Sequence, residues 1–192
     1  MVKHRLTLSA LAILSVVAAA VHAANLPRQS QELTVGLDDG RKVLLSQYKG
    51  KVVAVCFILT TCPHCQKTIG FLTKAQKEFG PRGFQVLASA IEPDAAAHVA
   101  GFIKQFNTPF PVGSNDGMIA LEWMQHPPML GPHMPMLAFV DRQGNVRAQF
   151  EGDDEKFFND RQEQNLRSQI EALLKDGAPA KKGAPTGAAA KK

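Results

Sequence analysis

Two apolar runs mark the centre of the chain. Residues 51–59 (KVVAVCFIL) and 84–91 (FQVLASAI) are almost continuously apolar, in contrast to the mixed polar and apolar segments around them. Runs of this length are typical of strands that are buried on both faces of a sheet. Between them, apolar residues recur at helical spacing after Pro63, a residue that suits the first position of a helix. The pattern predicts a buried strand, a helix beginning at residue 63 and a second buried strand.

Turn residues and helix caps delimit the other predicted elements. Asp-Gly chemistry at residues 38–40 and Arg142-Gln143-Gly144 favour a β-hairpin on either side of the central strands. Asp94 and Asp116 are the expected N-caps of two further helices. The predicted elements are a hairpin over 33–37 and 41–45, strands over 51–59 and 84–91, helices from 63 to about 79, over 94–106 and after 116, a hairpin over 136–141 and 145–150, and a last helix over about 154–174.

This order of elements predicts an α/β fold. It combines strand–helix–strand units with antiparallel hairpins, an arrangement typical of a mixed central sheet with an N-terminal β-hairpin and helices on both faces. Residues 24–176 are enough chain for one such domain with its own core.

The first 23 residues resemble a secretory signal. Lys3 and Arg5 precede an apolar stretch over 6–21, and Val21-His22-Ala23 offers a cleavage site, so we expect a mature chain that begins at Ala24 and is periplasmic or secreted. The alternative is an uncleaved anchor over residues 6–24, although Thr7, Ser9 and Ser15 weaken this 19-residue span.

The last 16 residues have the composition of a disordered tail. Residues 177–192 (GAPAKKGAPTGAAAKK) contain no large apolar side chain and cannot contribute to a core. We expect a solvated extension. Its four lysines leave open a weak attraction to an anionic membrane surface.

The net charge of +5 comes from the two ends of the chain. The signal contributes +2 and the tail +4, so residues 24–176 carry −1. A nucleic-acid-binding domain would need a basic face, and the balance of this domain gives no reason to expect one.

Cys62-Pro63-His64-Cys65 is the candidate active site. Two thiols three positions apart can interconvert between a dithiol and a disulfide. The expected position of Cys62 at a helix N-terminus favours its thiolate, which makes it the expected nucleophile, and Cys65 the thiol that resolves a mixed disulfide. Pro63 and His64 would tune the pair, because a protonated imidazole stabilises the reduced form.

A zinc half-site is the main alternative for the two cysteines. Structural zinc usually takes four ligands, whereas the third cysteine, Cys56, lies within an apolar strand. We therefore expect redox chemistry without a metal or another cofactor.

The chain resembles the thioredoxin-like superfamily, most closely the exported TlpA/ResA-like thiol-disulfide oxidoreductases, over about residues 30–175. The matching pieces are Asp39-Gly40, residues 45–51 (LSQYKGK), the apolar strand, the CxxC pair, and Met134-Pro135 followed by a strand and residues 141–144 (DRQG). The resemblance implies a thioredoxin-like fold in which Pro135 is a cis-proline facing the CxxC pair and Met134 lines a substrate groove. The alternative is that Pro135 has no role at the site and, with the three other prolines of residues 127–135, only stiffens a loop.

The chain departs from this family at several positions. Cys56 stands where many thioredoxin-like proteins bury an acid, and Thr68 where some reducing members have a glutamate. The CPHC motif looks like that of DsbA-type oxidases, so the framework and the motif indicate opposite directions of electron flow. We interpret Cys56 as a small core residue rather than a third redox thiol.

A cluster of soft ligands offers a function of another class. Met118, Met124, Met129, Met134 and Met136 lie within 19 residues, together with His126 and His133. Methionine, histidine and cysteine are plausible Cu(I) ligands, so a copper-binding or copper-delivery protein is the alternative. The other interpretation is flexible apolar packing around a loop that recognises varied substrates. Peroxidase activity is less favoured, because Leu59 stands where peroxiredoxins place threonine.

The sequence thus predicts an exported thiol-disulfide oxidoreductase. We expect it to exchange disulfides with protein substrates and with a redox partner protein, and we expect no nucleic-acid partner.

Overall fold

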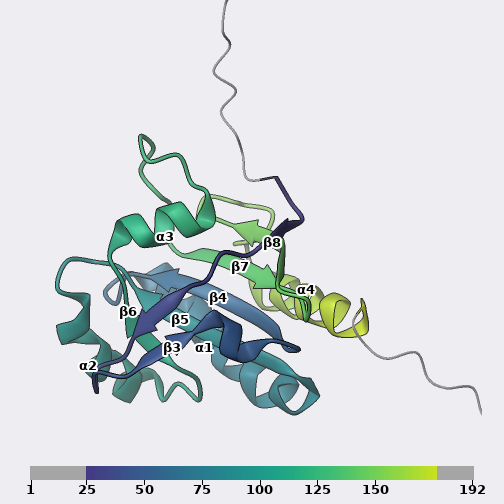
Figure 1. The fold of residues 1–192 in the computed structure, drawn as a ribbon, viewed down its shortest axis with the longest axis horizontal. Coiled ribbons are helices and arrows are strands. Elements are labelled where there is room, and N and C mark those ends of the chain that lie inside the picture. The colour runs from purple at the N-terminus through teal and green to yellow at the C-terminus, as the bar shows by residue number, and fades with distance from the viewer. Residues whose placement is uncertain (1–24, 177–192) are drawn as a thin grey trace, which may run out of the picture.

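The computed structural model describes residues 25–176, which form an eight-stranded mixed sheet with four α-helices (Figure 1). The strand order is β1-β8-β7-β4-β5-β6-β2-β3. The predicted signal over 1–23 and tail over 177–192 lie outside the described residues. The elements are β1 (Arg28–Gln29), β2 (Thr34–Gly36), β3 (Lys42–Leu44), the 3-10 helix η1 (Leu45–Tyr48), β4 (Val52–Ile58), α1 (Pro63–Phe79), the 3-10 helix η2 (Gly80–Arg82), β5 (Phe84–Ala90), α2 (Ala95–Phe106), β6 (Val112–Ser114), α3 (Gly117–Met124), β7 (Met136–Val140), β8 (Asn145–Phe150) and α4 (Gln162–Asp176).

The two apolar runs form the centre of the sheet. All seven residues of β4 are buried, and β4 pairs in parallel with β5 along its whole length, from Val52 opposite Phe84 to Ile58 opposite Ala90. On its other side β4 pairs antiparallel with β7. A strand that is paired on both edges and covered on both faces requires continuous apolar sequence. This requirement explains why the apolar run predicts a buried strand.

Helices cover both faces of the sheet, as predicted. Residues of α1, α2 and α4 pack on one face in a first core cluster that includes Cys56 and Cys65. The other face is covered by α3 and the segment around η1, whose apolar residues form a second cluster around Phe57 and Trp123. The rings of Phe57 and Trp123 meet edge to face, with centroids 5.9 Å apart. The predicted α/β class and the N-terminal hairpin are confirmed.

The beginning of the last helix was predicted wrongly. Instead of starting near residue 154, α4 begins at Gln162. The Asp154 carboxylate accepts hydrogen bonds from the backbone N–H groups of Lys156 and Phe157, at 3.0 and 3.2 Å, and so closes a turn. Phe157 is buried and stacks on Phe150 with ring centroids 3.9 Å apart. This contact fixes the turn against the sheet and delays the helix.

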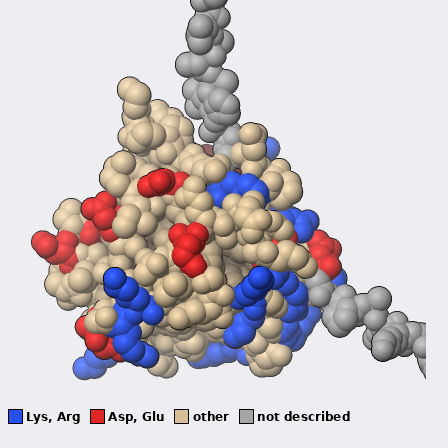
Figure 2. Space-filling model, viewed as in Figure 1, with Lys and Arg blue, Asp and Glu red and all other residues tan. Residues whose placement is uncertain are grey.

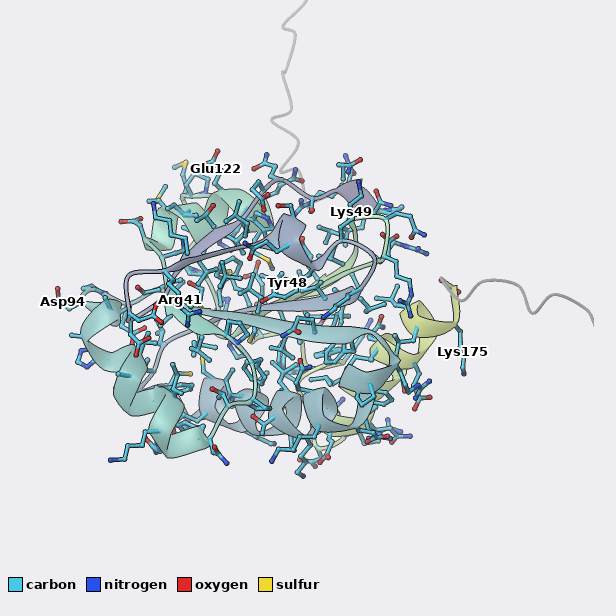
Figure 3. The ribbon with its side chains drawn as sticks, turned by 60° about the horizontal axis from the view of Figure 1, so that its bottom comes forward. Arg41, Tyr48, Lys49, Asp94, Glu122 and Lys175 are labelled. Carbon is cyan, nitrogen blue, oxygen red and sulfur yellow. The ribbon has the colours of Figure 1, made fainter. Side chains whose placement is uncertain are left out.

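Two local features at the other elements also differ from expectation. Asp94 precedes α2 but has a left-handed backbone (φ 58°), and its side chain makes no capping hydrogen bond. Its carboxylate lies at the outer edge of the molecule instead (Figure 3). The two-residue strand β1, which pairs with β8, is too short to produce a sequence pattern. By contrast, Asp116 caps α3 as predicted, accepting from the N–H of Met118 at 2.7 Å.

The surface of the domain shows no dominant charge in the view of Figure 2, where acidic and basic side chains are interspersed over largely uncharged surface. None of the helices in the described part of the chain has the length and apolar character needed to span a bilayer.

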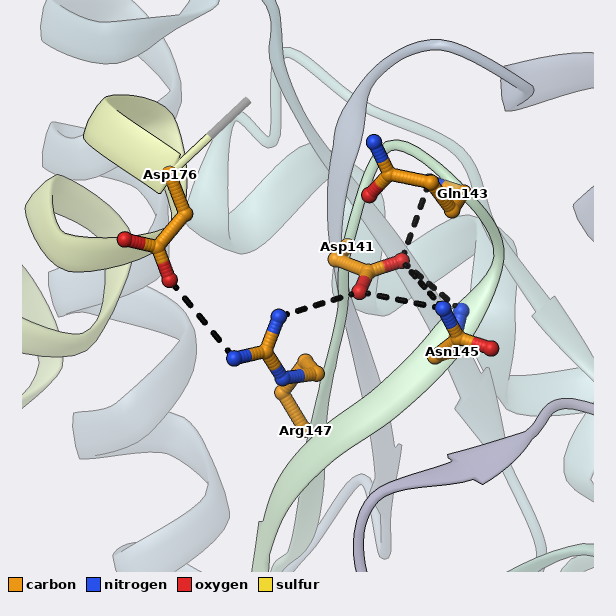
Figure 4. A network of polar contacts seen from close by, with 5 residues as sticks. All are labelled: Asp141, Gln143, Asn145, Arg147 and Asp176. Carbon is orange, nitrogen blue, oxygen red and sulfur yellow. Dashed lines mark hydrogen bonds and ion pairs between the residues drawn. The ribbon is translucent and has the colours of Figure 1, made fainter. Parts of the chain in front are cut away.

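The β7–β8 hairpin is fixed by the buried carboxylate of Asp141 (Figure 4). Its Oδ1 accepts from the backbone N–H groups of Gln143 and Asn145, both at 2.9 Å, and its Oδ2 accepts from Arg147 at 3.2 Å. Arg147 extends the network to Asp176 at the end of α4. Burial alone would raise the pKa of Asp141, but the hydrogen bonds outweigh it and hold this pKa below its ordinary value.

We expect Asp141→Asn to lower the free energy of unfolding by about 1–3 kcal/mol, because buried donors lose a charged acceptor. The lowered pKa means that the stabilisation is present above the unfolded-state pKa and is lost as pH falls through the folded-state pKa. Urea unfolding at neutral and acid pH measures both effects. Asp39→Asn, which removes the exposed ion pair with Arg41, is the control and should leave the free energy of unfolding unchanged at both pH values. A deficit for Asp141→Asn that persists unchanged at acid pH would contradict this account.

Candidate functional site

Cys62 occupies the N-cap of α1, and a three-residue segment joins it to the central strand β4. Its backbone is extended, Pro63 follows at the first helical position, and its Sγ accepts from the N–H of Cys65 at 3.4 Å. The side chain is half-buried. A sulfur at this position faces the unpaired N–H groups and the positive end of the helix dipole, an environment that favours a thiolate. The predicted position of Cys62 is confirmed.

Cys65 lies one turn further along α1 and is fully buried in the first core cluster. Its Sγ accepts from the N–H of Leu59 at 3.5 Å. Burial raises the pKa of the Cys65 thiol well above its ordinary value, and the neighbouring Cys62 sulfur adds to this effect. The two sulfurs of the pair therefore differ sharply. Cys62 is half-buried at the helix N-terminus, whereas Cys65 is covered, and its burial favours the neutral thiol.

Cys56 lies on β4 in the same cluster as Cys65 and has no exposed surface. Burial raises its thiol pKa far above the usual range. It therefore has neither the access nor the charge that an attacking thiol needs, in agreement with its interpretation as a core residue.

Glu92 joins the site from the segment just after β5. Its Oε1 accepts from both the backbone N–H, at 2.9 Å, and the hydroxyl of Thr60. The side chain of Gln66 in turn donates to the Thr60 carbonyl at 2.9 Å. The short segment that leads from β4 to Cys62 is thus held by side chains of β5's end and α1. The second carboxylate oxygen of Glu92 is buried without a partner among the described residues.

A buried polar contact between α1 and α4 supports the first turn of α1. The Thr68 hydroxyl donates to the His64 carbonyl at 2.9 Å and accepts from the side-chain amide of Gln162 at 2.7 Å. Both Thr68 and Gln162 are buried, so this contact ties α4 to the turn that carries the motif. His64 itself is exposed. Glu92 and Gln162 were not predicted as site residues, because each makes its contact with a residue far away in the chain: Thr60 is 32 residues from Glu92, and Thr68 is 94 residues from Gln162.

The Met134–Pro135 peptide bond is cis, as the family resemblance implied. It immediately precedes β7, whose first residue, Met136, lies opposite Phe57 of β4 in the sheet register. The start of β7 therefore lies beside the end of β4, from which the chain leads to Cys62. Met134 is half-buried and packs against the first core cluster, as does Cys62. The structure thus brings the cysteine pair and the Met134-Pro135 segment to the same edge of the sheet.

The methionines of the proposed soft-ligand set are dispersed. Met124 and Met136 are buried in the second core cluster, whereas Met118 and Met129 are exposed. Met129, at 94% exposure, stands at the tip of the loop before Met134. Packing and loop exposure account for these positions better than a shared ligand sphere does.

Comparison with known proteins assigns this chain to a family. The family model described as Redoxin matches residues 24–170, which is most of the chain. The chain belongs to the Redoxin family. As a Redoxin protein it carries the CxxC pair at the helix N-terminus and the cis-proline segment described above.

Two kinds of known proteins share part of the sequence. The thiol-disulfide oxidoreductase ResA of Bacillus thuringiensis subsp. konkukian is 28% identical over 119 residues, which cover 62% of this chain and 65% of ResA. The probable glutathione peroxidase 8-B of Xenopus laevis is 32% identical over 90 residues, 43% of either chain. The match therefore spans just under two thirds of the ResA relatives' length.

Solved structures confirm the thioredoxin-like fold. A thiol:disulfide interchange protein of the thioredoxin family from Chlorobium tepidum TLS superposes with a TM-score of 0.65 and 20% identity, covering 79% of this chain and 99% of that one. A thiol:disulfide interchange protein from a Bacteroides species gives a TM-score of 0.64 at 18% identity, covering 84% and 96%.

We expect the three cysteines of the reduced, native protein to react with iodoacetamide at very different rates. Cys62 should be alkylated at least roughly tenfold faster than Cys65, because Cys62 is accessible at the helix N-terminus, whereas Cys65 is buried and its thiol pKa is raised. Cys56 should react only after unfolding. Mass spectrometry of peptides from a timed reaction at neutral pH measures each rate. Equal labelling of Cys62 and Cys65 in the folded protein would contradict the assigned roles.

Proposed function

We propose that this Redoxin protein is an exported thiol-disulfide oxidoreductase that exchanges disulfides with partner proteins through its CPHC site. The observation that carries the proposal is the asymmetry of the pair, with Cys62 half-buried at the N-cap of α1 and Cys65 fully buried one turn later. Similarity to ResA, a thiol-disulfide oxidoreductase, supports the same reaction class.

In the reducing direction, the Cys62 thiolate attacks one sulfur of a substrate disulfide. A mixed disulfide forms between Cys62 and the substrate, and the substrate's other sulfur leaves as a thiolate that takes up a proton. Cys65 then loses its proton and attacks the Cys62 sulfur, which releases the second substrate thiol and leaves the Cys62–Cys65 disulfide. The pair has given two electrons to the substrate, and a redox partner protein restores the dithiol. The oxidising direction is the reverse sequence.

The surrounding residues supply position and tuning in this scheme. The N–H of Cys65 and the first turn of α1 stabilise the Cys62 thiolate, and the exposed His64 adds positive charge beside it when protonated. Met134 and Pro135 shape the groove in which the substrate segment lies. Burial keeps the Cys65 thiol protonated, so that it does not react until the mixed disulfide has formed.

We expect Cys62→Ser to abolish disulfide exchange, because the buried Cys65 has no access to substrate. Cys65→Ala should retain attack by Cys62 and accumulate mixed disulfides with partner proteins. Non-reducing gels and mass spectrometry of the trapped species measure this, and Cys56→Ala is the matched control that should trap nothing. Exchange at an unchanged rate in Cys62→Ser, or no adducts with Cys65→Ala, would contradict the proposed roles. Rapid turnover of a peroxide by Cys65→Ala would instead indicate peroxidase chemistry.

Export is supported by the basic, then apolar, then small-residue pattern of residues 1–23. An oxidising compartment allows the Cys62–Cys65 disulfide to persist. N-terminal sequencing of protein recovered from the periplasm or medium of a bacterial host measures the prediction: a chain beginning at Ala24 is expected. Recovery only from the cytosol with residues 1–23 intact would contradict export, and recovery from the membrane with them intact would indicate an anchor.

A further inference from the structure

Three side chains that could together hold a metal ion meet beside the cis Met134–Pro135 bond. His133, Glu151 and Asp153 each place one possible ligand atom within 4.8 Å of the others. Within residues 25–176 no other group of three or more histidine, cysteine or acidic side chains meets this distance. The three residues come from two segments, namely the loop between α3 and β7 and the turn after β8.

Backbone contacts hold these two segments together. The N–H of Gly152, between the two acids, donates to the carbonyl of His133 at 2.8 Å. The chains approach so closely here that a Cβ at position 152 would lie 2.3 Å from the Met134 carbonyl oxygen, which only glycine avoids. The placement of His133 beside Glu151 and Asp153 therefore follows from a fixed backbone and does not depend on side-chain rotamers alone.

A buried histidine orients one of the candidate ligands. The imidazole of His126 is only 6% exposed, and its Nδ1 lies 2.7 Å from Glu151 Oε1. Its Nε2 lies 3.0 Å from the Leu130 carbonyl, so both ring nitrogens are occupied. His126 thus supports the Glu151 carboxylate as an outer partner, in the way that metal-ligating carboxylates are usually held by further hydrogen bonds.

The donor set indicates the class of ion. One imidazole nitrogen and two carboxylate oxygens suit a divalent ion such as Zn²⁺, with a water completing the coordination, whereas Cu(I) prefers the thiolate and thioether sulfurs that this group lacks. Zinc bonds of about 2.0–2.2 Å bring tetrahedral ligands to about 3.4 Å from one another. His133 and Asp153 are each about 60% exposed, so their side chains are free to close by the required amount.

We propose that His133, Glu151 and Asp153 form a binding site for a divalent metal ion, Zn²⁺ being the representative, at the loop that leads into Met134-Pro135. A bound ion would tie this loop to the end of β8. It would thereby fix His133, which directly precedes Met134 and Pro135 of the proposed substrate groove. The simpler explanation of the same contacts is an ion pair between His133 and Asp153, whose Nδ1 and Oδ2 lie 3.2 Å apart.

Calorimetric titration of the full chain with Zn²⁺ tests the site. The Cys62–Cys65 pair is first oxidised to its disulfide, so that these thiols are removed as zinc ligands and the result is independent of exchange activity. We expect a Zn²⁺ site that is weakened more than about tenfold by His133→Ala and by Asp153→Asn. The controls His98→Ala, on the exposed face of α2, and Glu155→Gln, an exposed acid near the site, should leave the affinity unchanged.

Three further readouts separate the metal site from an ion pair. Binding should weaken as the pH falls, because the ligating imidazole must be neutral. The His133 ring signals should be the histidine signals that shift on Zn²⁺ addition in an NMR spectrum. Ca²⁺ should not compete, since an imidazole is a poor ligand for it. An ion pair only, seen as no binding up to about 1 mM Zn²⁺, equal affinity in His133→Ala, or equal binding of Ca²⁺, would overturn the proposal.

Discussion

The first turn of α1 determines the chemistry of this protein because it places two sulfurs in opposite environments. Cys62 lies at the helix N-cap, where the N–H of Cys65 and the helix dipole favour an anion. Cys65 faces the core, where burial favours the neutral thiol. This difference requires a buried strand, β4, that ends just before the motif, and a core that α1 covers.

The rest of the fold holds the first turn of α1 beside the Met134–Pro135 segment. Pairing of β4 with β7 brings the cis Met134–Pro135 bond to the edge at which β4 leads into Cys62. Glu92 holds the entering segment through Thr60, and Gln162 supports the turn through Thr68. The carboxylate of Asp141 fixes the turn at the far end of β7. The site therefore rests on contacts from the end of β5 and from α1, α4 and β7, and not on the motif alone.

The sequence predicted the parts of the fold whose signals are local. Continuous apolar runs identified β4 and β5, Pro63 identified the start of α1, and Asp116 identified the cap of α3. The start of α4 was missed because the stacking of Phe157 on Phe150 is a tertiary contact that overrides acidic residues typical of a helix N-terminus. The site contacts of Glu92 and Gln162, and the meeting of His133 with Glu151 and Asp153, could not be predicted for the same reason. Their neighbours lie far away in the chain, and nothing in the local pattern indicates which side chains will meet.

The reduction potential of the Cys62–Cys65 pair tests the account most directly. Equilibration of the protein with defined ratios of reduced and oxidised glutathione or dithiothreitol, followed by counting of free thiols, measures it. We predict one reversible two-electron transition between about −270 and −120 mV, with Cys56 remaining a thiol throughout; a value near the upper limit indicates an oxidant and one near the lower limit a reductant. Absence of a reversible two-thiol transition would contradict the assignment of this pair as the redox centre.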